Sequence, residues 1–381
     1  MAYNDGTSRI GQIDKAGDVD ALFLKVFSGE VLTTFEENNI MMPLHRTRTI
    51  SSGKTAQFPT TGVAEAKYHT PGESLFGDEY NSASAYLSKV AHSEVTIAID
   101  GVLTASAFLN DIDEAKNHYE VRSIYSTEIG RQLAYHADRA VMRTIVGGAR
   151  ATTDRFANTI SNSSQTYGGG VIQLGANTPA GLELLPDFSF ATDGDLVGGS
   201  TDGADGLAAN AKGSELMLDA LFTIARLMDQ KNVPAAGRYA VLPPNVYYKL
   251  LTGNQDAINR DFGNDGNGSL AQGQIVSVAG IRILKSNHVP TTDESTGTLF
   301  TDPSVKNDLF GSNSGYGGNC SETVGFVFQT EAVGTVKLMD LAMESEYFME
   351  RMGTLMMAKY AMGHGVLRNE ACYEIVLDAA A

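Results

Sequence analysis

The feature that most constrains the fold is one very long amphipathic helix, predicted over residues 111–147. Asp111 and Glu114 have the spacing of an N-terminal cap and its reciprocal carboxylate, and Gly147 with Gly148 supplies the predicted stop. The helix would be about 50 Å long at 1.5 Å per residue, against a usual length of about 12 residues. Gly130 lies near its middle, where a glycine costs about 1 kcal/mol relative to alanine. Between the ends, apolar residues recur at steps of three and four: Ile112, Ala115, Tyr119, Ile129, Leu133, Ala137, Val141 and Ile145.

A long hairpin is predicted over residues 60–100. An extended segment runs into a tip rich in Gly, Ser and Asn, and the strand SEVTIAIDG returns with Val95, Ile97 and Ile99 on one face. A hairpin of this length cannot bury its own faces. Together with a polar, Gly-rich arm at residues 1–20, it predicts a subunit that is completed by its neighbours in an assembly.

The rest of the chain predicts a mixed α+β fold. A second helix is expected over residues 214–231, with Leu218, Leu221, Phe222, Ala225 and Met228 on one face. The segments RYAVLPP, NVYYKLLTG and IVSVAGIRILKS predict a buried strand, a short helix and a strand–turn–strand unit in turn. Residues 150–212 and 291–323 are rich in loop-forming residues, and the segment from residue 325 onward is mostly strand-like.

Composition excludes several classes of protein. The formal net charge is −17, and Lys and Arg are scattered without a basic run, so we expect no specific nucleic-acid binding. Cys320 and Cys372 have neither a metal-ligand spacing nor a disulfide framework. No window reaches the roughly 18 apolar residues that a membrane span needs, and no signal peptide is recognised. We expect a soluble protein made in a cytoplasm.

The stretch RTISSGKTAQFP, residues 48–59, contains the Gly-Lys-Thr that ends many phosphate-binding loops. Such a loop needs an earlier glycine at the position of Arg48, and a helix that begins at Lys54. Pro59 and the β-type residues argue against that helix. We therefore interpret the stretch as a turn between two extended segments, with an NTPase that uses Lys54 as the weakest alternative.

The sequence contains no recognisable catalytic, cofactor or metal site. Its seven histidines are isolated, and no nucleophile motif accompanies them. His364, within MGHG, is interpreted as part of a tight turn between strands.

Several long words, in the same order along the chain, resemble major capsid proteins of short-tailed, T-seven-like phages (the podovirus type). They are LFLKVFSGEVLT (22–33), RTISSGKTAQFP (48–59), TIAIDGVLTA (96–105), DIDEAKNHYEVRS (111–123), AVGTVKLMDLAME (332–344) and AKYAMGHGVLRNEA (358–371). The matches cover both flanks of the chain, and the middle, roughly 150–325, matches weakly.

The resemblance implies an α+β phage major capsid fold of the Hong Kong 97 type. Its parts would be an N-terminal arm (1–54), an extended-loop β-hairpin (55–97), a peripheral domain (98–150) with the spine helix 111–147, an axial domain (151–328), and a tail (329–381) that completes the peripheral sheet.

The resemblance also implies a function and partners. Copies would close as hexamers and pentamers into an icosahedral shell, T=7 in this family, around double-stranded DNA that is enclosed without specific binding. A scaffolding protein would assist assembly in the host bacterial cytoplasm, a portal protein would occupy one vertex, and no membrane or cofactor would be involved. An encapsulin-like compartment of the same fold is the alternative.

The basic joint and the hairpin supply the expected contacts between subunits: Arg46, Arg48, Lys54, Lys67 and Glu73. Gly130 is the candidate hinge at which the spine helix bends in the precursor shell, and close packing against a strand is the alternative explanation for this glycine.

Overall fold

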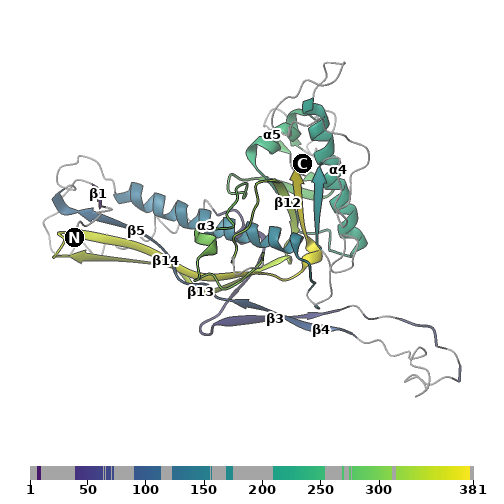
Figure 1. The fold of residues 1–381 in the computed structure, drawn as a ribbon, viewed down its shortest axis with the longest axis horizontal. Helices are drawn as coiled ribbons and strands as arrows, with labels where there is room; N and C mark the ends of the chain where they lie inside the picture. Colours follow the sequence, from purple (N-terminus) through teal and green to yellow (C-terminus); the bar gives the residue numbers. More distant parts are fainter. Residues whose placement is uncertain are drawn as a thin grey trace.

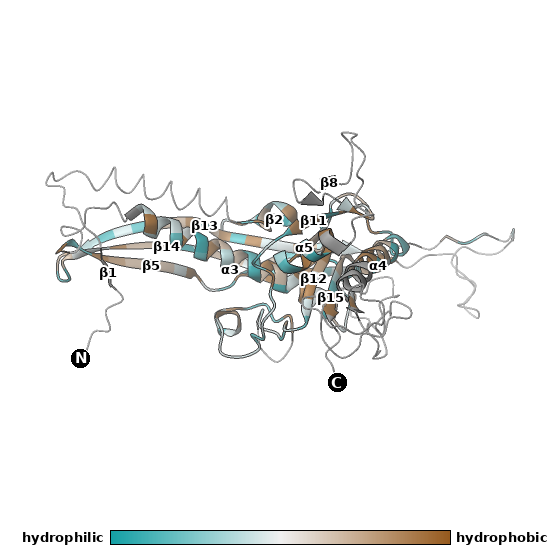
Figure 2. Ribbon diagram, turned by 90° about the horizontal axis from the view of Figure 1, so that it is seen from above, coloured by the Kyte–Doolittle hydropathy of each residue, from teal (hydrophilic) through white to brown (hydrophobic). Residues whose placement is uncertain are grey.

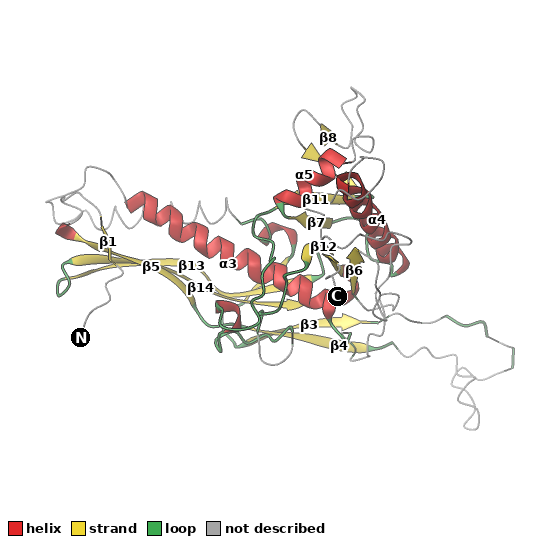
Figure 3. Ribbon diagram, turned by 45° about the horizontal axis from the view of Figure 1, so that its top comes forward, coloured by secondary structure: helices red, strands yellow, loops and turns green. Residues whose placement is uncertain are grey.

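The computed structural model describes residues 7–9, 39–62, 64, 66–69, 71–72, 90–112, 122–154, 156, 169–174, 209–253, 268–269, 274–275, 277–310 and 315–377. They form an α+β molecule with two main sheets (Figure 3). A long five-stranded sheet, with one helix lying along it, forms the elongated part of the molecule on the left of Figure 1. A six-stranded sheet with two helices forms the part on the right.

The elongated part is built on a five-stranded sheet of order β1-β5-β14-β13-β2. The strands are β1 Thr7–Arg9, β2 Arg46–Thr49, β5 Leu103–Asn110, β13 Val333–Phe348 and β14 Gly353–Val366. The antiparallel β13–β14 ribbon, the longest element of the sheet, is flanked by antiparallel β5 on one side and by parallel β2 on the other.

One face of this sheet is covered by helix α3, Arg122–Arg150, which confirms the helix prediction over residues 122–147. The apolar stripe is the reason, since Leu133 and Ala137 are fully buried against Met356 and Tyr360 of β14. Ile112 was wrongly placed on the buried stripe, because it is 62% exposed. The predicted start is at Asp111, and Asp111 and Ile112 are helical, whereas the capping partner Glu114 lies outside the described residues.

The predicted stop at Gly147 and Gly148 is wrong, because α3 continues through both glycines to Arg150. Both positions face close neighbours instead. A Cβ on Gly147 would lie 2.9 Å from Leu309 Cβ, and one on Gly148 would lie 3.0 Å from Cys372 Sγ. Gly147 therefore allows close approach of the helix to the loop at Leu309, and Gly148 allows close approach to β14 and β15.

The six-stranded sheet has the order β10-β11-β7-β12-β15-β6. Its strands are β6 Gly170–Leu174, β7 Arg238–Leu242, β10 Ser277–Val278, β11 Ile281–Lys285, β12 Thr323–Gln329 and β15 Cys372–Leu377. Helices α4, Ala209–Gln230, and α5, Pro244–Gly253, pack on its core. In Figure 2 hydrophobic residues are concentrated in β12 and β15, in agreement with their buried positions.

The local predictions for this part are confirmed: a buried strand at β7, a short helix at α5, and a strand–turn–strand unit at β10–β11. Helix α4 begins before the predicted Ser214, and Phe222, predicted to be buried, is 57% exposed. The tail, residues 329–381, was expected to complete one sheet, but it contributes to both. Strands β13 and β14 join the long sheet, whereas β15 pairs with β12 and β6.

The predicted hairpin is confirmed at its base, where β3, Thr55–Thr61, pairs with β4, His92–Ala98. It leaves the long sheet and extends below the six-stranded part in Figure 1. Most of its tip, including Glu73, lies outside the described residues. Shorter elements complete the fold: 3₁₀ turns at Met42–Leu44, Leu299–Thr301 and Asn369–Ala371, and strands β8 Gly268–Ser269 and β9 Gln274–Ile275.

The prediction that His364 sits in a tight turn is wrong, because His364 lies within β14. The glycines on either side of His364 leave room for strand β4 of the hairpin. A Cβ on Gly363 would overlap the carbonyl oxygen of Ala98, and one on Gly365 would lie 2.8 Å from Ile97 Cγ1. The two glycines thus let β4 approach the backbone of β14.

Within the described residues, no helix is long and apolar enough to cross a membrane.

Candidate functional site

The joint between the first part of the chain and the hairpin is formed by β2, the turn Ser51–Lys54 and β3. Gly53 adopts a φ of +119°, which favours glycine, and β3 follows directly from Thr55. The backbone of Lys54 is used in the fold, because its carbonyl accepts a hydrogen bond from Ile99 N at 3.0 Å. The prediction of a turn between two extended segments is confirmed. A phosphate-binding loop is disfavoured here, since a strand follows the lysine in place of a helix.

The basic residues of the joint differ in their contacts. Arg48 donates to the carbonyl of Gln57 at 3.1 Å and lies 5.7 Å from the centre of the Phe58 ring, so it ties β2 to β3. Arg46 and Lys54 are exposed, and neither forms an ion pair with a described residue. Lys67 is exposed in the hairpin arm, far along the chain from the joint. The structure therefore brings Arg46, Arg48 and Lys54 together in one joint, and Lys67 lies apart from them.

Two buried histidines anchor the joint to the long sheet. His45 Nδ1 donates to the carbonyl of Met41 at 2.7 Å, so its Nε2 accepts from Thr335 Oγ1 at 2.5 Å. Thr335 Oγ1 then accepts from His364 Nδ1 at 2.8 Å. Burial lowers the pKa of His45, and burial lowers the pKa of His364 to about 3. Both rings are therefore neutral at physiological pH. The series of hydrogen bonds connects His45, directly before β2, with β13 and β14.

Gly130 lies inside α3 and is buried, next to Ile129, which packs on the long sheet. Its position within the helix is as predicted. Its role as a hinge remains a prediction.

A second anchor lies on the helix at Asp138, whose side chain is fully buried. Its carboxylate accepts from the backbone N–H groups of Ile40 and Met41, both at 3.0 Å, and interacts with His288 Nδ1 at 2.9 Å. This one carboxylate fixes the start of the joint and the loop after β11 to the spine helix. His288 also lines an open cavity of about 420 Å³ beside Lys285 and Tyr248.

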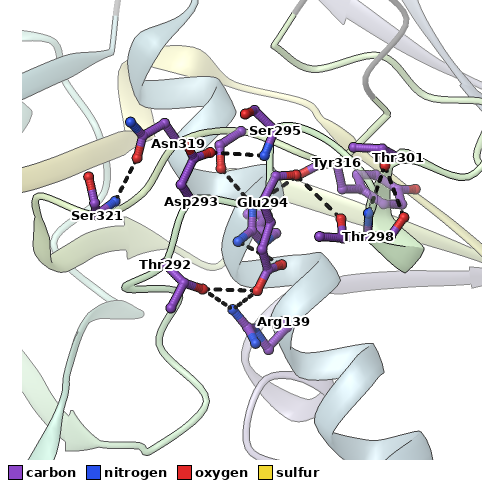
Figure 4. Close-up of polar contacts among 12 residues, drawn as sticks. Arg139, Thr292, Asp293, Glu294, Ser295, Thr298, Thr301, Tyr316, Asn319 and Ser321 are labelled. Atoms are coloured by element: carbon purple, nitrogen blue, oxygen red, sulfur yellow. Dashed lines mark hydrogen bonds and ion pairs between the residues drawn. The ribbon is translucent and has the colours of Figure 1, made fainter.

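A cluster of charged side chains lies one turn further along α3 (Figure 4). Glu294 points from its loop toward the helix and contacts Arg139 at 2.5 Å and Arg143 at 2.8 Å. Arg143 is fully buried and also donates to the carbonyl of Gly318 at 3.2 Å. Burial lowers the pKa of the Arg143 guanidinium, because the charged form is removed from water. Two cations and one carboxylate thus clamp the loop onto the helix.

Sequence reasoning missed these buried groups. Asp138 and Arg139 lie beside the predicted apolar stripe, between Ala137 and Val141. Arg139 and Arg143 are four residues apart, so they share one face of the helix. This polar face is the signal that could have indicated a second surface packed against α3. The partner residues His288 and Glu294 lie about 150 positions away, in segments without periodicity.

The geometry described here is that of an anchored scaffold. Among the described residues, no group of three or more His, Cys, Asp or Glu side chains is placed to hold a metal ion. What the joint and the hairpin present to their surroundings is an exposed, extended surface.

Comparison with known proteins agrees with this architecture. A family model described as Gp10A-like major capsid protein matches residues 57–178 and 195–376. The major capsid protein of Escherichia phage T7 is 34% identical over 376 residues, which are 97% of this chain and 96% of that protein. The major capsid protein of Enterobacteria phage T3 is 35% identical, with coverage of 98% and 96%. Among solved structures, the capsid of cyanophage P-SCSP1u is similar at a TM-score of 0.65 and 36% identity, covering 99% of this chain and 100% of that one.

Proposed function

Because this chain belongs to the Gp10A-like family of major capsid proteins, we propose that it builds the icosahedral wall of a phage head from hexamers and pentamers of itself. It is a structural subunit of a virion shell, and its assembly from many copies agrees with the capsid structures it resembles. The observation that carries the proposal is the full-length similarity to phage capsid proteins, combined with a fold whose hairpin and joint extend from the core.

We further propose that assembly takes place in the host bacterial cytoplasm around a scaffolding protein, with a portal protein at one vertex. The shell encloses double-stranded DNA without specific contacts. The net charge of −17 supports this last point, since an acidic wall does not bind the packed DNA. The chain has no enzymatic role in this proposal.

For the parts of the subunit, we propose that residues 1–54 act as the arm, 55–97 as the extended loop, and 98–150 with strands β13 and β14 as the peripheral domain. The axial domain comprises residues 151–328 and takes β15 as an additional strand, because β15 pairs with β12.

We propose that Arg46, Lys54, Lys67 and Glu73 contact neighbouring subunits. Arg46 and Lys54 have exposed cationic groups at the joint, which supports a role in contacts with an acidic neighbour. Arg48 has its own contacts within the chain, so its contribution combines contact with positioning of the joint. Lys54→Glu should impair shell assembly while the subunit stays folded. Normal shells from this variant would refute the proposed contact.

Gly130 is proposed as the hinge of the spine helix, since a glycine inside a helix weakens it locally. Cryo-microscopy of precursor and expanded shells tests this role. A helix that is equally straight in both shells would end the hinge proposal and leave close packing as the reason for the glycine.

The alternatives are disfavoured. The relatives at 34–36% identity are phage capsid proteins, which argues against an encapsulin-like compartment. The strand that follows Lys54 argues against an NTPase.

Co-expression with the scaffolding protein of the same genome tests the function. We expect uniform closed shells of hexamers and pentamers by cryo-microscopy. Soluble subunits that never close into shells under these conditions would overturn the proposal.

A further inference from the structure

The extended hairpin is held at its base by a loop from the far end of the sequence. We call this loop, residues 292–310 and 315–318, the brace. Both ends of the brace contact α3, because Glu294 pairs with Arg143 near one end and Arg143 donates to the carbonyl of Tyr316 at 3.4 Å near the other. The middle of the brace, Ser304–Asn307, reaches residues 98–101, where the hairpin leaves the long sheet.

The contact at the hairpin base is made by one side-chain amide. Ala98 N donates to Asn307 Oδ1 at 3.0 Å, and Asn307 Nδ2 donates to the carbonyl of Ala98 at 2.7 Å. The amide therefore satisfies both backbone groups on the open edge of β4, as a residue of a neighbouring strand would. Next to it, Gly101 N donates to the carbonyl of Ser304 at 2.9 Å.

Asp100 and Tyr316 complete the contact. Asp100 accepts from Lys306 N at 2.8 Å and from the buried hydroxyl of Tyr316 at 2.6 Å. The same hydroxyl accepts from His364 N of β14 at 2.8 Å. Burial raises the pKa of Asp100, and burial raises the pKa of Tyr316 well above its ordinary value. The phenol thus stays protonated and links the brace, the hairpin base and the long sheet.

We propose that the brace sets the direction in which the hairpin leaves the subunit, and that Asn307 and Tyr316 are the positioning residues for the hairpin in shell assembly. Apart from the brace, the described contacts of the hairpin with the long sheet are those of its base with β2, β13 and β14. It is two-stranded, and its buried residues Ala56, Phe58 and Ile97 lie near its base. A two-stranded ribbon without a third strand does not hold its own orientation. The brace links that ribbon to the spine helix, through Glu294 and Arg143.

This inference rests on the proposed function, because it concerns the direction of an assembly element. Its main test is made on the unassembled full chain, so that its failure is separate from a failure to form shells. Spin labels on Thr61→Cys at the end of β3 and Gln132→Cys on the exposed face of α3 report the hairpin direction as a distance distribution. The native Cys320 and Cys372 are buried, so labelling is directed to the introduced thiols.

We expect a narrow distribution for the unmutated brace and a broad one for Asn307→Ala and Tyr316→Phe. Amide exchange in residues 92–99 should become about tenfold faster in Asn307→Ala, because both hydrogen bonds between the Asn307 amide and Ala98 are lost. The matched control is Asn287→Ala, which removes the same amide from an exposed turn and should leave both readouts unchanged.

The variant Asn307→Asp tests whether the hydrogen bonds of the Asn307 amide hold the hairpin, because Asp has nearly the same size as Asn but a different pattern of donors. At about pH 8 the new carboxylate keeps the acceptor for Ala98 N but places a negative charge against the Ala98 carbonyl and Asp100, so the hairpin is released. At about pH 5 the acid regains a donor, because burial and the Asp100 charge raise the pKa of such a carboxyl. The other groups that face this position are Lys306, Tyr316 and His364, and the unmutated protein is measured at both pH values as the reference.

A hairpin distance that is broad at the higher pH and narrow at the lower pH supports the proposal, together with misshapen or absent shells from Asn307→Ala. A distance as narrow in Asn307→Ala as in the unmutated chain would overturn it. So would an Asn307→Asp variant whose distance is the same at both pH values. If Asn307→Ala fails to fold, the pH comparison on Asn307→Asp still decides.

Discussion

At the residue scale, Glu294 is the carboxylate that pairs with both Arg139 and Arg143 of the spine helix. Glu294→Ala should lower the free energy of unfolding by about 3–5 kcal/mol, since breaking a buried ion pair leaves an uncompensated charge. Chemical denaturation of the unassembled subunit measures the change. The matched control is Glu128→Ala, which removes an exposed partner of Arg131 and should cost less than about 1 kcal/mol. Equal losses in both variants would contradict the clamp.

His364 makes stability depend on pH. Its pKa in the folded state is depressed to about 3, so the unfolded chain binds its proton first as the pH falls below about 6.5. The unfolded state gains protons that the folded state does not, and stability decreases on acidification by up to about 1.4 kcal/mol per pH unit for this group. His45 acts in the same direction, and Asp100, with its raised pKa, acts in the opposite direction.

The measurement is the free energy of unfolding from about pH 7 to pH 4.5, a range chosen to span the ordinary histidine pKa. His364→Gln should reduce the loss on acidification relative to the unmutated subunit, because the titrating group is gone. An unchanged slope in His364→Gln would show that the ring is not kept neutral by burial.

At the element scale, the C-terminal turns of α3 depend on close approach. Gly148→Ala gains about 1 kcal/mol of helix propensity but places a Cβ 3.0 Å from Cys372 Sγ and Val366. Overpacking of a filled core costs about 1–3 kcal/mol, and Cys372 is fully buried within a strand, so we expect net destabilisation. Denaturant midpoints decide the sign, with the exposed Gln132→Ala as the control. A more stable Gly148→Ala would show that the strands have room to move.

The same element shows how far sequence reasoning reaches. The stripe of Leu133, Ala137 and Val141 predicted α3 because a helix repeats its faces every three to four residues. Gly147 and Gly148 were misinterpreted as the end of the helix. In the sequence, a glycine that makes room for a closely packed segment cannot be distinguished from one that ends a helix. Only the packed structure distinguishes the two.

Local sequence patterns do not predict which distant strands pair in a sheet. The strand-like character of residues 372–377 was predicted. Its place in the sheet depends on pairing with β12, about 50 positions away, and with β6, about 200 positions away. The contacts that tie the joint to the helix, through Asp138 and His288, were missed for the same reason. Sequence reasoning could place three basic residues in one joint because they are close in the sequence: Arg46, Arg48 and Lys54.

At the scale of the whole molecule, the net charge of −17 opposes the association of copies. Added salt shortens the range of this repulsion to about 10 Å at 0.1 M. We therefore expect shells to form faster in moderate salt than at low ionic strength, as measured by light scattering with the scaffolding protein present. Slower assembly in salt would mean that attraction at the basic joint outweighs the repulsion between acidic surfaces.

The position of β15 has a consequence for the timing of folding during synthesis. β15 is the last described strand to leave the ribosome, yet it lies inside the six-stranded sheet, with β12 on one side and β6 on the other. Until it emerges, β6 has no neighbour in the sheet and one edge of β12 is open. The six-stranded part is therefore completed only after residue 377 has been translated. We therefore expect a chain that is still bound to the ribosome, or truncated before β15, to lack a finished six-stranded sheet.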